Sequence, residues 1–274
     1  MINTKRVTLT FGKQCNMRCP FCYAFFDGND LLTVDKYKKI IRKCKSLNIE
    51  TVNIAGGDPL LYSEICDIVE CSKNLGMRTT LDTNCLSFNP SKHVDLINSL
   101  DMISVPIDGC NEKTHDRVRS FIGSFKKVVN TIETISEMSD KIEIRVNTVV
   151  VKDNYKELDG IAELLSQYPI TFWHIYDFIP IGRGRQHKAD LCIDCEEYKK
   201  NIYDLMCKGY KYTIEYNAPD KRKQEHIYIS SNGTVYSNSC NPYDDYFMGK
   251  NILDCSGNSI LDYLSVEACE VGEL

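Results

Sequence analysis

Residues 6–23 read RVTLTFGKQCNMRCPFCY, and this stretch passes from an alternating segment directly into three cysteines. Polar and apolar side chains alternate over residues 6–11, which is typical of a β-strand. Cys15, Cys19 and Cys22 follow with the spacing C-x3-C-x2-C. In barrel-type α/β folds, the loops that leave the carboxyl ends of the strands carry the chemistry. The stretch therefore predicts a functional site immediately after the first strand.

Short apolar runs alternate with longer stretches of helical period along much of the chain. Thr33 has the side chain of a helix N-cap and opens the first expected helix. Strand–helix repeats of this kind form parallel sheets with right-handed crossovers. Six repeats rather than eight predict an α/β fold, a partial (β/α)6 parallel barrel open on one side. The expected strands span residues 6–11, 51–55, 77–82, 102–107, 142–150 and 171–178, and the later helices span 62–75, 91–99, 125–138 and 155–167.

The pattern changes after about residue 180. Residues 182–185 are expected to form a loop, 194–207 a helix, 225–230 and 234–237 a β-hairpin, and 258–264 a short helix. Such a tail is too small for a hydrophobic core of its own. We therefore expect residues 1–180 to form the barrel core. Residues 181–274 would be a small C-terminal extension, with a β-hairpin and helices, that closes the mouth or an edge of the barrel.

The charge balance and the cysteine content restrict the class of protein. The chain has 274 residues, of which 33 are basic and 38 acidic, so its net charge of −5 offers no general attraction to a nucleic-acid polymer. No apolar run reaches the ~18 residues of a membrane span. The first residues do not resemble a signal peptide, so we expect a cytoplasmic protein with no membrane partner. Fourteen cysteines fit a reducing compartment, where thiols bind metals or pack as small apolar groups.

Three closely spaced thiols can bind zinc or an iron–sulfur cluster. Structural zinc requires a fourth ligand, which the remote pair Cys192 and Cys195 could supply. A [4Fe–4S] cluster bound by Cys15, Cys19 and Cys22 leaves one iron without a protein ligand. That iron can bind a small molecule, so the pattern favours chemistry over a purely structural metal.

The three cysteines, with Phe21 before the last of them, resemble the signature of the radical S-adenosylmethionine (radical SAM) superfamily. The resemblance implies that Cys15, Cys19 and Cys22 bind one [4Fe–4S] cluster, whose open iron chelates S-adenosylmethionine. An external electron donor of the flavodoxin or ferredoxin type then drives cleavage of the sulfonium to methionine and a 5′-deoxyadenosyl radical. In such enzymes the cofactors supply the difficult chemistry and the protein orients them.

Several segments after the strands resemble cofactor-binding positions of the same family. Gly56–Pro59 reads GGDP and resembles the family motif GGEP, with Asp58 in place of glutamate. Thr83 and Asn84 end the third expected strand, and Cys85 stands where the family usually has glycine. The resemblance implies that the cofactor-binding residues are Tyr23, Gly56, Gly57, Asp58, Pro59, Thr83, Asn84, Ser104, Asp108, Arg145, Asn147 and Ile179.

Arg145 and Asn147 lie two residues apart on the fifth expected strand and therefore share a face. If that face points into the barrel, the arginine needs an anionic partner, because an unpaired buried charge is costly. The partner is either the carboxylate of the cofactor or a structural acid. His174 is expected on the sixth strand, where it either contacts substrate or packs in the interior. The catalytic residues stay unassigned, with Arg145 and His174 as candidates.

The tail partly resembles the SPASM and twitch extensions that bind auxiliary clusters in some family members. Its cysteines do not reproduce the spacing of those extensions, so we expect no auxiliary cluster. These cysteines are Cys192, Cys195, Cys207, Cys240, Cys255 and Cys269.

The substrate is the least determined feature. Chain length and the early triplet also resemble viperin, which converts a nucleoside triphosphate, but Thr51 and His174 stand where we expect lysines and leave mainly Arg145. The first strand begins near Met1, so we expect no leader-binding domain before the barrel. We therefore expect hydrogen abstraction from a small metabolite or a short peptide. A viperin-like nucleotide reaction is the alternative, and an iron–sulfur electron carrier or regulator is the non-enzymatic one.

Overall fold

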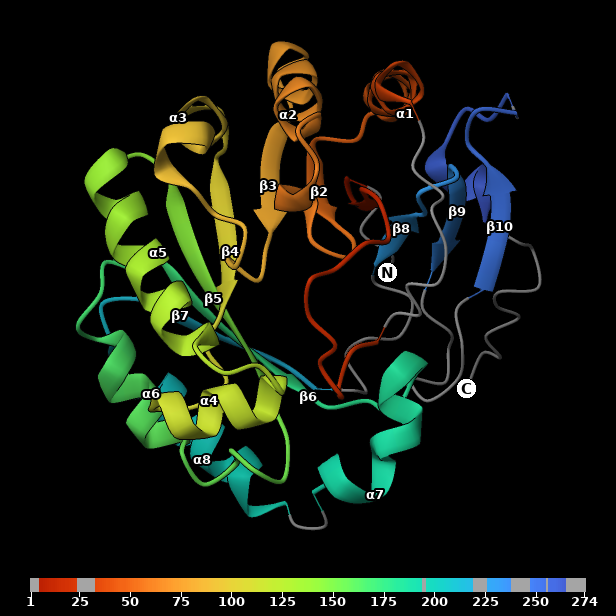
Figure 1. Ribbon diagram of the computed structural model, residues 1–274. Helices are drawn as coiled ribbons and strands as arrows, with labels where there is room; N and C mark the ends of the chain where they lie inside the picture. The colour runs from red at the N-terminus through yellow and green to blue at the C-terminus, as the bar shows by residue number, and fades with distance from the viewer. Residues whose placement is uncertain are drawn as a thin grey trace.

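The computed structural model describes residues 5–23, 33–193, 196–218, 226–237, 247–254 and 256–264. Within them, one ten-stranded sheet has the order β10-β9-β8-β1-β2-β3-β4-β5-β6-β7. The edge strands β10 and β7 are not paired with each other, and Figure 1 shows the sheet curving around an interior with most helices on its outer side. The expected partial barrel, open on one side, is confirmed.

Six parallel strands form the middle of this sheet. Each pairs in parallel with the next along the chain. Their bounds match the predicted ones or are shorter by a residue at one or both ends, because the predicted runs include the first residue of a turn. The strands are β1 (Arg6–Thr10), β2 (Thr51–Ala55), β3 (Arg78–Asp82), β4 (Met102–Pro106), β5 (Glu143–Val150) and β6 (Phe172–Asp177).

The connecting helices also lie where they were predicted. The Thr33 side chain accepts a hydrogen bond from the backbone N–H of Lys36 and caps α1. One further helix, α4 (Glu112–Arg119), was not predicted, because its sequence EKTHDRVR has almost no apolar stripe; Asn111 caps it by accepting from the N–H of Thr114. The expected helices are α1 (Val34–Ser46), α2 (Ile65–Asn74), α3 (Pro90–Ser99), α5 (Ser124–Met138) and α6 (Leu158–Leu165).

The two faces of the strands differ in polarity. Val7 and Leu9 of β1 are buried in the hydrophobic core, together with Trp173 of β6. Arg6 and Thr8 alternate with these core residues and remain partly exposed. Since successive side chains of a strand point to opposite faces, the core lies between the sheet and the outer helices. The inward face of the sheet is polar.

The C-terminal extension widens the sheet at both edges. β7 (Thr213–Asn217) pairs in parallel with β6, and β8 (Ile227–Ile229) pairs in parallel with β1. β9 (Thr234–Ser237) completes the expected hairpin with β8, and β10 (Phe247–Asn251) adds an antiparallel edge strand. The sequence did not predict β7 or β10, because each is a short segment with few apolar residues.

The helical elements after residue 180 differ in part from the prediction. Residues expected as a loop form the 3-10 helix η2 (Gly182–His187), which continues into α7 (Lys188–Leu191). The last expected helix is a single 3-10 turn, η4 (Ile260–Tyr263), closed by a capping box between Ser259 and Asp262. The helix predicted over residues 194–207 is α8 (Glu197–Met206). No helix in the described ranges is long and apolar enough to cross a membrane.

Candidate active site

The cysteine loop leaves β1 between two tyrosine hydroxyl groups. The N–H of Gly12 donates to the hydroxyl of Tyr37 at 3.2 Å, and the N–H of Gln14 donates to the hydroxyl of Tyr62 at 2.9 Å. Tyr37 belongs to α1, and Tyr62 follows the 3-10 turn η1 (Pro59–Leu61). Two neighbouring β-α units therefore fix the direction in which the loop starts.

The GGDP turn packs directly against this loop. The N–H of Gly57 donates to the carbonyl of Gly12 at 3.3 Å, and the N–H of Asp58 donates to the carbonyl of Gln14 at 2.8 Å. A Cβ atom at Gly57 would lie 1.9 Å from the Gln14 carbonyl oxygen, and Gly56 has φ 141. The resemblance implied that these glycines bind the cofactor; in the structure, the backbone of the cysteine loop approaches them closely.

Asp58 joins the turns that follow β2 and β3. Its fully buried carboxylate accepts hydrogen bonds from the N–H of Leu60 at 2.9 Å, the hydroxyl of Thr83 at 3.0 Å and the N–H of Asn84 at 2.8 Å. Burial raises the pKa of Asp58, and the hydrogen bonds from Asn84, Leu60 and Thr83 act in the opposite direction. The aspartate that replaces the usual glutamate thus binds protein groups on every side.

Asn84 extends this network to the cysteines. Its Nδ2 donates to Oδ1 of Asn16 at 2.7 Å and lies 3.6 Å from the sulfur of Cys15. The N–H of Met17 also donates to the sulfur of Cys15, at 3.4 Å. The following residue, Cys85, has φ 70, in the left-handed region that glycine adopts most readily.

The three cysteines lie within electrostatic reach of one another. Cys19 is buried, and Cys15 and Cys22 are partly buried. Burial raises the pKa of the Cys19 thiol to about 11; the Arg119 guanidinium lowers it, while Cys22 and Cys15 raise it. Nη1 of Arg119 lies 3.9 Å from the sulfur of Cys19. Two of the three sulfurs therefore face N–H donors, which suits thiolates bound to iron.

The positions of the described thiols bear on the choice between a single zinc ion and a cluster. Among the described residues, no three histidine, cysteine or carboxylate groups converge closely enough to hold one metal ion. Zinc requires such convergence, whereas the cysteines of a [4Fe–4S] cluster bind different irons and lie farther apart. Cys195, half of the possible remote zinc pair, lies outside the described residues. The geometry thus gives no support to a zinc site within the described part of the chain.

A buried ion pair adjoins Cys19. Nε of Arg119 donates to Oδ2 of Asp108 at 2.7 Å, and Oδ1 of Asp108 accepts from the N–H of Val149 at 2.8 Å. The Arg119 guanidinium also lies over the ring of Phe21, 5.4 Å from its centroid. Asp108 was expected near the cofactor; in the structure it is fully buried and positions Arg119.

Arg119 was absent from the predicted site. It ends α4, a helix that the sequence did not predict. The carboxylate of Asp116 accepts from the N–H groups of Gly123 and Phe125 and so orders the chain after α4. The signal that could have found Arg119 is its spacing from Asp108, since both follow β4.

Arg145 has the structural acid as its partner. Its Nη2 lies 3.6 Å from Oδ1 of Asp82, and its Nε donates to the hydroxyl of Ser104 at 3.0 Å. The residue is 5% exposed. Asn147, two residues further along β5, has a buried side-chain oxygen with no hydrogen-bond partner among the residues that the structure describes. Among the expected cofactor residues, Asn147 is thus the one with an acceptor left over.

The other expected residues surround this edge of the sheet. Tyr23 is 43% exposed, and Pro59 is buried in η1. Ile179 follows β6, and its carbonyl accepts from the N–H of Ile181 at 2.8 Å. His174 stacks on Tyr176 with ring centroids 4.2 Å apart and lies 3.7 Å from a carboxylate oxygen of Glu215. His174 therefore faces the interior from β6, farther along the sheet from the cysteine loop.

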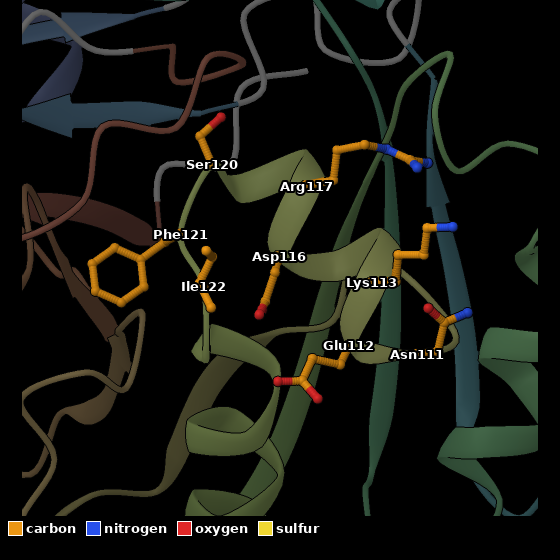
Figure 2. A pocket seen from close by; sticks show the side chains of 8 residues that line it. All are labelled: Asn111, Glu112, Lys113, Asp116, Arg117, Ser120, Phe121 and Ile122. Atoms are coloured by element: carbon orange, nitrogen blue, oxygen red, sulfur yellow. The ribbon is translucent and has the colours of Figure 1, made fainter.

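A separate hollow of about 740 Å³ lies over α4 (Figure 2). None of the expected site residues lines it. Arg117 at its rim is bound to Asp153, and Asp116 is bound to backbone N–H groups. Ile122, 91% exposed, stands beside it. We assign this hollow no part in the chemistry.

The sequence profile of the Radical SAM superfamily matches residues 9–165, more than half of the chain. The chain therefore belongs to this superfamily, and the expectation of an enzyme rather than an iron–sulfur carrier is confirmed. The family uses a [4Fe–4S] cluster and S-adenosylmethionine, as the resemblance implied.

Relatives and solved structures agree with this assignment. The GTP 3′,8-cyclase of Clostridium perfringens is 27% identical over 85% of this chain and 70% of its own length. An S-adenosylmethionine-dependent nucleotide dehydratase of Lacinutrix mariniflava is 27% identical over 84% of this chain, which spans only 50% of that protein. The structure of anSMEcpe with bound AdoMet and a peptide superposes with a TM-score of 0.73 at 15% identity, covering 94% of this chain and 80% of that one. The last likeness shows the fold alone.

Proposed function

We propose that Cys15, Cys19 and Cys22 hold a [4Fe–4S] cluster, and that S-adenosylmethionine binds beside it at the carboxyl ends of the strands. The enzyme would then abstract a hydrogen atom from a small metabolite or a peptide. The observation that carries the proposal is the arrangement of three cysteines with N–H donors against the sulfurs of Cys15 and Cys19. When bound, the cluster and the cofactor supply the radical chemistry.

The residues of this chain orient and shield that site. Arg119 offers a guanidinium close to Cys19, and Asp108 fixes its direction. Guanidinium groups pair strongly with carboxylates, so we propose Arg119 as the partner of the cofactor carboxylate. Arg145, the partner expected from the sequence, contacts Asp82 and Ser104 on the inward face of the sheet.

The remaining cofactor assignments belong to the same proposal. Gly56–Pro59 and Thr83–Asn84 form the strand-end turns beside the cysteine loop. The unpaired oxygen of Asn147 offers an acceptor to a hydroxyl or amino group of the cofactor. Tyr23 and Ile179 would border the adenosyl part.

We also propose an external electron donor of the flavodoxin or ferredoxin type and a cytoplasmic location, which the fourteen cysteines favour. Residues 1–180 would form the catalytic barrel core. Residues 181–274 would complete its edges, consistent with the strands β7 to β10 that they add.

Conversion of a nucleoside triphosphate is the second candidate. It is supported by the two relatives named above, whose names place nucleotides among their substrates. The chain spans half of the dehydratase, so that reaction is not transferred to this protein as a whole.

The deciding experiment compares Cys19→Ala with Cys207→Ala, a control at the exposed end of α8. Both proteins are reconstituted anaerobically with iron and sulfide, reduced, and incubated with S-adenosylmethionine. We expect the wild type and the control to hold about four irons per chain and to release 5′-deoxyadenosine. The Cys19→Ala protein should lose most iron and at least ~100-fold of the product, because one ligand of the cluster is gone.

Full iron retention by Cys19→Ala would contradict the ligand assignment. A Cys15/Cys19/Cys22→Ala triple variant that still held several irons would show that cysteines of the tail bind metal. That outcome would contradict our prediction that the chain has no auxiliary cluster.

A further inference from the structure

The inward face of the sheet carries polar side chains that are partly exposed. Arg6 of β1, Asp82 of β3, His174 of β6 and Tyr228 of β8 all have intermediate exposure. On the opposite face, the strand residues of the core are almost fully buried. Polar atoms of the inward face therefore remain partly accessible.

Two arginines converge on this interior from different strands. β1 and β5 are separated by three strands in the sheet, yet Arg6 and Arg145 interact electrostatically. Burial lowers the pKa of Arg6, and the like charge of Arg145 lowers it further, while Asp82 raises it. Arg6 alternates with the core residue Val7, and Arg145 lies between the core residues Ile144 and Val146, so both arginines belong to the inward face of the curved sheet.

The cationic charge of this pair is only partly balanced. Asp82 lies 3.6 Å from Arg145 and also accepts from Nδ2 of Asn53 at 2.9 Å. The Arg6 guanidinium makes no hydrogen bond or ion pair with any residue in the described ranges. Two guanidinium groups thus share one carboxylate. A half-buried cation without a hydrogen-bond partner is costly, and binding an anion would offset that cost.

Flat aromatic surfaces flank the same interior. His174 and Tyr176 stack on β6, with ring centroids 4.2 Å apart. Tyr228 of β8 and Tyr236 of β9 stack with centroids 5.0 Å apart. Tyr176 and Tyr228 are also among the groups that raise the pKa of Arg6, which places both pairs within electrostatic reach of it. Such surfaces suit a planar ring system, as nucleobases do.

We infer that Arg6 and Arg145 form a phosphoryl-binding subsite in the barrel interior, so that the substrate is a phosphorylated small molecule. A phosphoryl group carries close to two negative charges near neutral pH, which matches two guanidinium groups better than a single carboxylate does. The inference rests on the proposed function, because it assigns the substrate class of that site. Arg6 was not predicted as a site residue, because a basic residue at the start of a strand usually faces solvent.

The test measures binding to the anaerobically reconstituted full chain by calorimetry. The probes are the four ribonucleoside triphosphates, inorganic triphosphate, the four nucleosides, and citrate as a carboxylate anion. The variants are Arg6→Gln, Arg145→Gln and Arg145→Lys, with Arg78→Gln as the control. Arg78 also lies in a strand, but its side chain is exposed and paired with Glu143.

We expect at least one phosphorylated probe to bind, and its nucleoside to bind more weakly. Arg6→Gln and Arg145→Gln should each raise its Kd by ~10-fold or more, because a charge-assisted hydrogen bond is lost. Arg145→Lys should restore part of the affinity, and Arg78→Gln should have no effect. Arg6→Gln keeps the experiment decisive if Arg145→Gln folds poorly, because Arg6 has no hydrogen bond to lose.

Three results would overturn the inference: no phosphorylated probe binds, binding is unchanged in Arg6→Gln, or citrate binds more tightly than every phosphorylated probe. Release of 5′-deoxyadenosine by the wild type without any probe tests the proposed function separately. A protein that cleaves S-adenosylmethionine but binds no phosphorylated probe would refute only the subsite.

Discussion

The carboxyl edge of the sheet and its inward face are built in opposite ways. At the edge, the cysteine loop, the GGDP turn and the Thr83–Asn84 turn bind one another through backbone groups and the carboxylate of Asp58. On the inward face, within the described ranges, Arg6 makes no hydrogen bond and the side-chain oxygen of Asn147 has no partner. In the first region, the polar groups of the three segments bind one another. The second has polar groups left over, and such groups are where a ligand would be expected to bind.

The largest expected effect tests how tightly the edge is assembled. In Gly57→Ala the new Cβ would lie 1.9 Å from the carbonyl oxygen of Gln14, which is backbone and cannot rotate away. We expect a loss of about 3 kcal/mol or more in the free energy of unfolding, together with loss of the cluster. Urea denaturation and iron content measure these two effects.

Gly160→Ala is the matched control. Gly160 lies in α6, and its Cβ would meet only the side chain of Cys110, at 3.0 Å. Alanine stabilises a helix by up to ~1 kcal/mol relative to glycine. The free energy of unfolding of Gly160→Ala should therefore be no more than ~0.5 kcal/mol below that of the wild type. Equal stability of Gly57→Ala and Gly160→Ala would contradict the tight assembly of the edge, because the edge would then tolerate movement of its backbone.

An intermediate effect comes from His115, which supports the edge from α4. Its fully buried ring accepts from the N–H of Asp108 at 3.1 Å, and its other nitrogen lies 3.1 Å from the hydroxyl of Ser124. Burial lowers the pKa of His115 from 6.5 to about 2. The unfolded chain therefore binds a proton below about pH 6.5 that the folded chain does not bind.

The contribution of His115 to stability is fully present above about pH 6.5 and is lost as the pH falls below that value. The loss should reach at most about 1.4 kcal/mol per pH unit. Urea denaturation of the wild type and His115→Gln between pH 7 and pH 5 isolates it, since all other titrating groups are shared. We expect a shallower slope in His115→Gln; identical slopes would show that the ring is protonated in the folded protein.

The smallest expected effect concerns Cys85, at the end of the Thr83–Asn84 turn. Its φ of 70 disfavours any residue with a Cβ, while its buried side chain packs in the core. Cys85→Gly should therefore be more stable than Cys85→Ala by ~1 kcal/mol, because only the glycine removes the backbone strain. Both variants lack the thiol, so the difference in thermal stability between them does not include the effect of losing it.

Cys44 provides the control with the opposite sign. It is equally buried but lies within α1. In a helix, Cys44→Ala should be more stable than Cys44→Gly by ~1 kcal/mol. If glycine were no better than alanine at position 85, the strain at the edge would be unimportant, and the edge would differ less from the inward face than we infer.

Local sequence was sufficient for the parts of the fold that local patterns encode. The six central strands and their helices follow from apolar period and from caps such as Thr33. The helix α4 was missed because charged residues cover it, and β7 and β10 were missed because the sheet pairing around them, rather than their own apolar content, stabilises them. The site followed the same division: Cys15, Cys19 and Cys22 form a local sequence motif, whereas no local motif marks Arg6.

The family, the α/β architecture and the cysteine motif could therefore be predicted from local sequence, because spacing and periodicity are properties of neighbouring residues along the chain. The pairing of the charged side chains depends on the tertiary structure. It pairs Asp108 with Arg119 and Asp82 with Arg145, and it places Arg6 within electrostatic reach of Arg145 from a strand distant in the sheet. Electrostatic pairing depends on distance in space, and the curvature of the sheet sets that distance.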